Sequence, residues 1–119
     1  MIQIFGTPKC KHTRAAERFF KDRGIRFQLV DLKVKGPSAG ELESMARAVG
    51  GIEKLIDLSG ARAKAKGLHV AAPTGPRILE ALLADPLLLR TPVVRDGRVA
   101  TVGEAPAMWK QLAEREKGA

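Results

Sequence analysis

The chain has 119 residues, of which 45% are hydrophobic and 29% charged, and its formal net charge is +8. This length and composition favour one folded domain with its own core and exclude a mainly disordered chain. The only cysteine is Cys10, which excludes an internal disulfide or a cysteine-built zinc or iron–sulfur site within one chain.

The first third of the chain has the pattern of a strand, a helix and a second strand. Ile2–Phe5 is a short apolar strand, and Gly6–Pro8 follows as a turn. Apolar residues at helical spacing predict a helix over Ala15–Arg23. Arg26–Leu32 alternates polar and apolar residues, as a half-buried strand does. We expect these three elements to form a right-handed βαβ unit.

A helical insert is predicted next. Ser38 and Glu41 have the spacing of a capping box, and the helix that they start should end at Gly50. Further on, the sequence predicts a short helix over Ile52–Leu58, irregular structure over Ser59–Gly75 and a helix over Pro76–Leu83.

The chain closes with a predicted hairpin and helix. Asp96-Gly97 separates the extended runs Pro92–Arg95 and Arg98–Val102, a strong hairpin signal. The last helix follows Gly103, with Met108, Trp109 and Leu112 facing inward and a frayed end over Lys117–Ala119. This order predicts an α/β fold: a thioredoxin-like four-stranded mixed sheet as one domain over residues 1–119, with a helical insert at about 37–86.

Cys10 stands where the first strand ends and the first helix is about to begin. A helix N-terminus carries roughly half a positive charge and unpaired N–H groups, and both favour the reactive thiolate. Lys9, Lys11 and Arg14 add positive charge around it. Thr13, three residues on, is placed to donate a hydrogen bond to the sulfur. The alternative is a buried and inert cysteine.

Thr91-Pro92 is the second candidate feature. A proline at the start of a strand cannot donate to the sheet, and in thioredoxin-type domains a cis-proline lies beside the nucleophile. We therefore expect a cis bond, with Thr91 offering backbone groups to a substrate; a trans-proline at a plain strand start is the alternative. Arg62, Lys64 and Lys66 of the insert either fold back near the thiol to bind an anion or remain in a solvated loop.

Positive charge is concentrated near the N-terminus. Residues 1–35 contain nine Lys or Arg and three acids. Such a surface suits an anionic small ligand or an acidic protein, or it is simply a solvated helix face. Nucleic acid is disfavoured because the chain has no Tyr and its adjacent Phe19 and Phe20 have core spacing. His69 has no neighbouring ligand, so we expect no metal site.

The segment Phe5–Arg14 resembles the opening of the arsenate-reductase-like family, in which an aromatic residue, a loop with proline, the cysteine, a Ser or Thr and an Arg recur. The resemblance continues through Leu88–Val94 and the Gly103 turn, and it covers most of the chain. The family includes glutathione- and glutaredoxin-coupled arsenate reductases and Spx-type regulators that bind RNA polymerase.

The chain departs from both of these patterns. The resemblance implies three arginines that hold arsenate, but Thr91, the Gly103-Glu104 turn and the Leu55–Leu58 segment stand at those places, so we do not expect arsenate to be the substrate. Thr13 replaces the second cysteine of the Spx-type dithiol switch. Thr91 before the proline is instead reminiscent of glutaredoxins, where this residue pairs with the glutathione backbone.

These observations predict a monothiol oxidoreductase in which Cys10 and Thr13 are catalytic and Lys9, Lys11, Arg14, Thr91 and Pro92 bind ligand. Without a second cysteine, an external thiol such as glutathione must resolve the mixed disulfide. The alternatives are a redox-sensing regulator that binds an acidic partner through the first helix, and a family member without catalysis. The N-terminus has no signal-peptide pattern and no apolar run reaches about 20 residues, so we expect a cytoplasmic monomer with no bound cofactor and no membrane contact.

Overall fold

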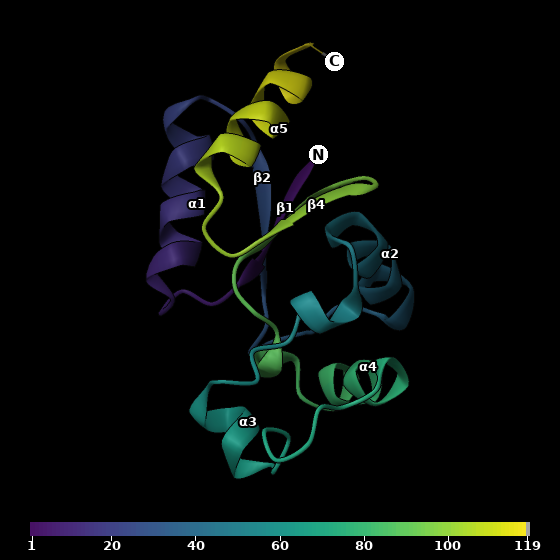
Figure 1. Cartoon of the computed structure of the whole chain (residues 1–119). Coiled ribbons are helices and arrows are strands. Elements are labelled where there is room, and N and C mark those ends of the chain that lie inside the picture. Colours follow the sequence, from purple (N-terminus) through teal and green to yellow (C-terminus); the bar gives the residue numbers. More distant parts are fainter. Residues whose placement is uncertain (119) are drawn as a thin grey trace.

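The core of the molecule is a mixed four-stranded sheet with helices on both faces (Figure 1). The computed structural model describes residues 1–118. In chain order the elements are β1 (Ile2–Gly6), α1 (Lys11–Asp22), β2 (Phe27–Asp31), α2 (Ala39–Val49), η1 (Ile52–Lys54), α3 (Ala61–Ala65), α4 (Gly75–Ala84), η2 (Pro86–Leu88), β3 (Val93–Asp96), β4 (Val99–Val102) and α5 (Pro106–Gly118).

The strand order is β2-β1-β3-β4. β1 runs parallel to β2 and antiparallel to β3, and β3 pairs antiparallel with β4. The β1-α1-β2 connection brings the carboxyl ends of two parallel strands to the same edge of the sheet, where the segments after both strands meet. The predicted α/β fold with a four-stranded mixed sheet is confirmed.

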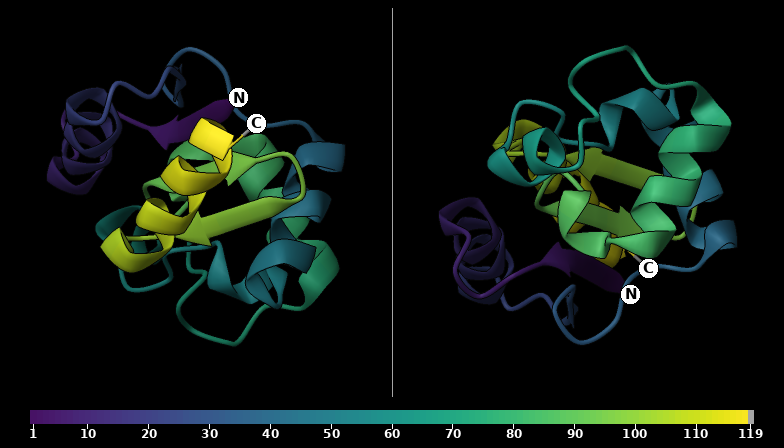
Figure 2. Two further views of the ribbon diagram at one scale, coloured as in Figure 1. Left: turned by 90° about the horizontal axis from the view of Figure 1, so that it is seen from above. Right: turned by 90° about the horizontal axis from the view of Figure 1, so that it is seen from below.

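Two apolar clusters lie on the two faces of this sheet, because side chains alternate along the central strands. Ile4 and Val94 point into a cluster with Phe20 and Trp109, which joins the sheet to α1 and α5. The other cluster joins the sheet to the insert and contains Phe5, Val93 and buried residues of α2, α3, α4 and η2, with the partly buried Ile52 of η1 packed against it. Figure 2 shows α1 and the α2–α4 insert on opposite sides of the strands.

Several local expectations are confirmed. Ser38 and Glu41 form both hydrogen bonds of the capping box at the start of α2, at 3.1 and 2.9 Å. Gly50 ends that helix with φ +91°, a left-handed conformation that favours glycine. β3 and β4 form the expected hairpin, with Asp96 opposite Val99 and a two-residue loop between them.

Other expectations are wrong in detail. The first helix begins at Lys11 and not at Ala15, and the segment Ile52–Leu58 is helical only over Ile52–Lys54. The insert region expected to be irregular contains the short helix α3. Met108 is 40% exposed because it lies one residue away from the buried stripe of Trp109 and Leu112. α5 extends through Gly118, and the rest of the expected frayed end, Ala119, lies outside the described residues.

Candidate active site

Cys10 is the N-cap residue of α1. Its extended backbone, with φ −79° and ψ 119°, lets its carbonyl accept the first helical hydrogen bond, from the Arg14 N–H at 3.0 Å. The Cys10 N–H donates to the Thr7 carbonyl at 3.1 Å, which closes the turn after β1. The sulfur therefore lies at the N-terminus of a twelve-residue helix, one turn closer to it than the sequence pattern predicts.

The pKa of the Cys10 thiol is lowered from its ordinary value. Partial burial raises this pKa, but hydrogen bonding to the sulfur from the hydroxyls of Thr13 and Thr91 and from the N–H groups of Thr13 and His12 outweighs it. The N–H groups of Thr13 and His12 make no capping hydrogen bond of good geometry to the sulfur in this structure. They therefore lower the pKa by stabilising the negative charge of the thiolate. The flanking cations are not among the groups that lower the pKa.

Thr91 contacts the sulfur directly, because its Oγ1 donates a hydrogen bond to Cys10 Sγ at 3.2 Å. The Thr91-Pro92 peptide bond is cis, as expected, and Pro92 is buried beside the start of β3. The sequence predicts only that the backbone groups of Thr91 face a substrate. The side-chain contact spans 81 positions in the chain, so no local pattern indicates it.

Thr13 is fully buried beneath the thiol, against Gly6 at the end of β1. Its Oγ1 has no hydrogen-bond partner of good geometry within residues 1–118. A hydroxyl proton rotates freely to suit its acceptor, so this group is available to turn toward the sulfur when the thiolate forms. This arrangement fits the lowering of the Cys10 pKa by Thr13.

The half-buried Cys10 lines an open cleft of about 400 Å³. Leu32 and Lys33 line it after β2, Asp57 contributes from the segment after η1, and Arg90 precedes Thr91. Lys33 could have been found from the sequence, because the carboxyl ends of the parallel strands β1 and β2 meet at one edge. The full set of lining residues is Thr7, Cys10, His12, Leu32, Lys33, Asp57, Leu87, Leu89, Arg90 and Thr91.

The three cations flanking the cysteine in sequence do not line this cleft. Lys9 and Lys11 are exposed. Arg14 is exposed as well, and its Nη1 donates to the Pro8 carbonyl at 2.9 Å, so it holds the turn that precedes the thiol. The structure thus separates these residues from Lys33 and Arg90, the cations that do line the cleft.

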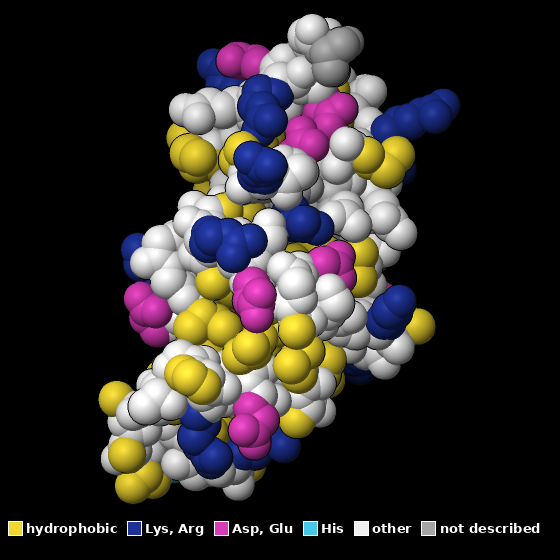
Figure 3. Space-filling model, turned by 90° about the vertical axis from the view of Figure 1, so that its right-hand side faces the viewer, with side chains coloured by type: hydrophobic (Ala, Val, Ile, Leu, Met, Phe, Trp, Pro, Cys, Tyr) yellow, Lys and Arg dark blue, Asp and Glu magenta, His cyan; other side chains and the backbone are white. Residues whose placement is uncertain are grey.

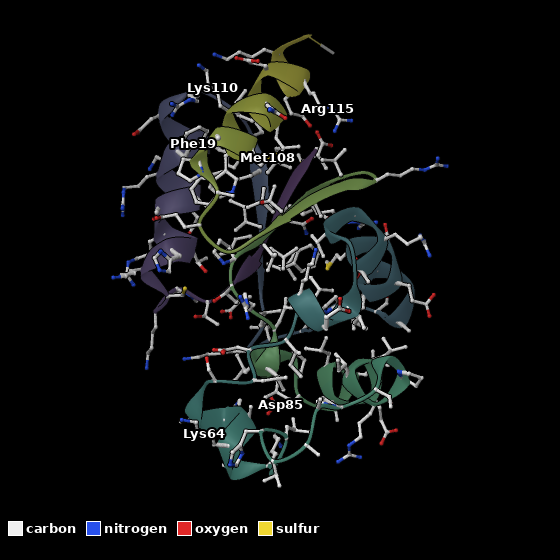
Figure 4. The ribbon with its side chains drawn as sticks, in the orientation of Figure 1. Phe19, Lys64, Asp85, Met108, Lys110 and Arg115 are labelled. Carbon is white, nitrogen blue, oxygen red and sulfur yellow. The ribbon has the colours of Figure 1, made fainter. Side chains whose placement is uncertain are left out.

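The basic residues of the insert form ion pairs away from the thiol. Arg62 Nε and Lys66 Nζ lie 3.1 and 3.5 Å from Asp85 Oδ2. Figure 4 shows Lys64 and Asp85 at the end of the insert that lies beyond the sheet. Of the two alternatives for Arg62, Lys64 and Lys66, folding back to the thiol is therefore excluded. At the thiol end of α1, His12 Nδ1 lies 3.4 Å from Glu104 Oε2, which joins α1 to the turn before α5.

Comparison with known families agrees with this geometry. The family model described as the ArsC family matches residues 5–112. The chain belongs to the ArsC family. Among curated proteins, this ArsC-family chain is similar to the regulatory protein MgsR of Bacillus subtilis strain 168, with 23% identity over 116 residues, which cover 97% of this chain and 92% of that protein.

Solved structures share the fold of this ArsC-family chain. A putative arsenate reductase from Yersinia pestis superposes with a TM-score of 0.83 and 22% identity, covering 93% of this chain and 99% of the other. A putative ArsC-family-related protein from Bacteroides fragilis gives a TM-score of 0.83 and 21% identity, covering 93% and 96%. At these identities the likeness establishes the thioredoxin-like architecture of the family.

Two negative findings apply to residues 1–118. No helix in this part of the chain is both long enough and apolar enough to span a bilayer. Nor do three or more His, Cys, Asp or Glu side chains gather there in an arrangement able to hold a metal ion.

Proposed function

We propose that this ArsC-family protein is a monothiol oxidoreductase that exchanges thiols and disulfides through Cys10. The main support is the combination of a lowered Cys10 pKa with an open cleft at the sulfur. Thiolates are the nucleophiles of disulfide exchange, so a thiol that ionises easily and is accessible suits this reaction. Thr13 and Thr91 would be its hydrogen-bonding partners.

The reaction needs no second protein cysteine. The Cys10 thiolate attacks one sulfur of a disulfide, a new S–S bond forms to that half, and the other half leaves as a thiolate that takes a proton from water. An external thiol such as glutathione then attacks the substrate-derived sulfur of the mixed disulfide, a new S–S bond forms between them, and Cys10 leaves as the thiolate. Across the two steps one substrate half is reduced to a thiol and the external thiol is oxidised into a disulfide with the other half, so electrons balance.

Thr91 would also align the bound thiol peptide. Neither its backbone N–H nor its carbonyl is hydrogen-bonded within residues 1–118. Free backbone groups beside a nucleophile can pair with an extended peptide in the manner of strand addition. This supports the role predicted for Thr91 and Pro92 as the edge along which a glutathione-like molecule lies.

Mass spectrometry of the intact protein tests this proposal. We expect oxidised glutathione to add one glutathione to the wild-type chain and none to Cys10→Ser, and reduced glutathione to remove the adduct. We also expect wild-type protein to accelerate the reduction of hydroxyethyl disulfide by glutathione. If Cys10 reacts no faster than a free cysteine peptide at equal pH, the oxidoreductase proposal is wrong.

A regulator is the second candidate, because the matching curated relative is named a regulatory protein. The exposed cations of α1 would bind an acidic partner. Arg14, Arg18 and Lys21 are all exposed on this helix. On the opposite side of the molecule, Figure 3 shows Lys and Arg scattered among acidic and apolar side chains and not gathered into one patch.

Affinity capture with two matched double variants separates this candidate from the enzyme. If α1 binds an acidic partner, Arg18→Gln with Lys21→Gln should weaken capture several-fold, and the loss should be greater at low salt. Lys110→Gln with Arg115→Gln removes the same charge from α5 and should leave capture unchanged (Figure 4). Equal capture by the two double variants would rule out α1 as the docking face.

A further inference from the structure

Three charged side chains share the cleft with the Cys10 sulfur. Lys33, Arg90 and Asp57 all line it, so two cations and one anion face the same space. None of the three forms an ion pair with another residue of the described chain. Charges of both signs that are left without partners beside a reactive sulfur are suited to a ligand that carries both signs itself.

The backbone fixes Asp57 and Arg90 on neighbouring extended segments. Ile56 and Leu89 form an isolated antiparallel bridge between the insert and the chain before β3. The Asp57 N–H donates to the Leu88 carbonyl at 3.0 Å, and the Arg90 N–H donates to the Leu55 carbonyl at 2.7 Å. Asp57 and Arg90 therefore each directly follow a residue of this backbone bridge, and both residues line the cleft.

One oxygen of Asp57 is free for a ligand. Oδ1 accepts hydrogen bonds from the Ser59 N–H at 3.2 Å and the Ser59 hydroxyl at 2.9 Å, whereas Oδ2 accepts none within residues 1–118. A Cβ on Gly60 would lie 2.9 Å from Oδ2. Gly60 has φ −74°, which any residue adopts, so the backbone does not require glycine there. Its missing side chain leaves Oδ2 uncovered.

We infer that the cleft selects thiols and disulfides whose reacting half carries an ammonium and a carboxylate together, as an α-amino acid does. Asp57 Oδ2 accepts hydrogen bonds from the ammonium, and Lys33 and Arg90 hold the carboxylate. A ligand with a carboxylate alone would be repelled by Asp57 and leave it without a partner, and one with an ammonium alone would be repelled by the two cations and leave them without a partner. This inference rests on the proposed exchange reaction at Cys10.

Four small disulfides of different charge test the selection directly. Each half carries both charges in cystine, an ammonium in cystamine, a carboxylate in the disulfide of mercaptopropionate, and no charge in hydroxyethyl disulfide. The rate at which each forms a mixed disulfide with Cys10 is measured by intact-protein mass spectrometry. Each rate is divided by the rate of the same disulfide with a free cysteine peptide at equal thiolate concentration, which removes intrinsic differences in reactivity.

For the wild-type chain we expect the normalised rate for cystine to exceed that for either singly charged disulfide by about fivefold, the scale of a partly exposed charge pair. Asp57→Asn should remove most of this preference and favour the carboxylate-only disulfide. Asparagine retains an oxygen that accepts from Ser59, so the local turn is kept. Asp22→Asn removes the same charge from an exposed site at the end of α1 and is the matched control.

Two further variants separate charge from access. Gly60→Ala changes no charge but covers Asp57 Oδ2, and it should lower the preference for cystine as Asp57→Asn does. Arg90→Gln with Lys33→Gln should favour the ammonium-only disulfide. Circular dichroism and thermal melting confirm that each variant is folded before its rates are compared.

The outcomes distinguish this inference from the proposed function. If all four disulfides react with Cys10 at the same enhanced normalised rate, or if the carboxylate-only disulfide is the fastest in the wild type, the selection for both charges is wrong and the exchange reaction stands. If no disulfide reacts faster than with the free peptide, both fail together.

Discussion

Replacement of Thr13 by valine should raise the pKa of Cys10, because a hydrogen bond to a charged group contributes about 1.5–3 kcal/mol. Below that pKa the thiolate fraction falls, but a more basic thiolate is more nucleophilic, so alkylation at pH 7 should slow only about threefold. At pH values above both pKa values the variant should react faster than wild type. Rates of alkylation by iodoacetamide from pH 5 to 10 give the Cys10 pKa and the reactivity of the thiolate for both proteins.

The same replacement should not destabilise the fold. Valine has the shape of threonine, and the Thr13 hydroxyl is buried without a partner of good geometry, so its removal leaves no orphaned group. Thr91→Val should shift the pKa in the same direction through loss of the 3.2 Å contact. Thr74→Val, at an exposed N-cap that makes no side-chain hydrogen bond, is the control. An unchanged Cys10 pKa in both Thr13→Val and Thr91→Val would contradict the hydrogen-bond origin of the lowered pKa.

The pH dependence of stability gives an independent check that the Cys10 pKa is lowered in the folded chain. The folded-state pKa of Cys10 is lower than its unfolded-state pKa, so ionisation stabilises the folded chain. Relative to Cys10→Ser, this stabilisation is fully present above the unfolded pKa of about 8.5 and is lost as the pH falls through the folded pKa. Thr13→Val should reduce the difference between the melting curves at high and low pH.

Gly6→Ala should cause the largest loss of stability, about 1–3 kcal/mol, which lowers the melting temperature by several degrees. A Cβ on Gly6 would overlap the Thr13 Oγ1 and lie 2.7 Å from its Cγ2. Both residues are buried where β1 meets α1, so the helix that presents the thiol must shift to make room. We therefore expect the Cys10 pKa to rise as well.

Two comparisons make the origin of this loss testable. Gly40→Ala places a methyl group on the exposed side of α2, where the nearest atom is 4.0 Å away, and should leave the melting temperature unchanged or higher. Thr13→Ala should relieve part of the loss caused by Gly6→Ala, because the two side chains no longer compete for the same space. Additive losses in the double variant would show that Gly6 acts elsewhere.

The sequence predicts the sheet and its flanking helices well because the apolar periodicity and the turn residues agree along the chain. It places the start of α1 too late, because the charged segment from Lys11 to Arg14 has no apolar stripe. It cannot predict that Asp57 and Arg90 meet at the cleft, since that depends on the long-range bridge between Ile56 and Leu89. It also overvalues the lysines beside Cys10: hydrogen bonds, and not nearby cations, lower the thiol pKa.

The two sides of the cleft are anchored in different apolar clusters, which lie on opposite faces of the sheet. The helix that carries the sulfur is anchored through Ala16 and Phe20 in one cluster, whereas the wall with Asp57 and Arg90 is anchored through neighbouring residues in the other. The proposed substrate contacts of Asp57 therefore rest on a different cluster from the helix that carries the sulfur, whereas Thr91, next to Arg90, acts on the acidity of the thiol from the same wall. A redesigned wall that keeps Thr91 would change the proposed substrate contacts and leave the hydrogen bonding of the sulfur intact.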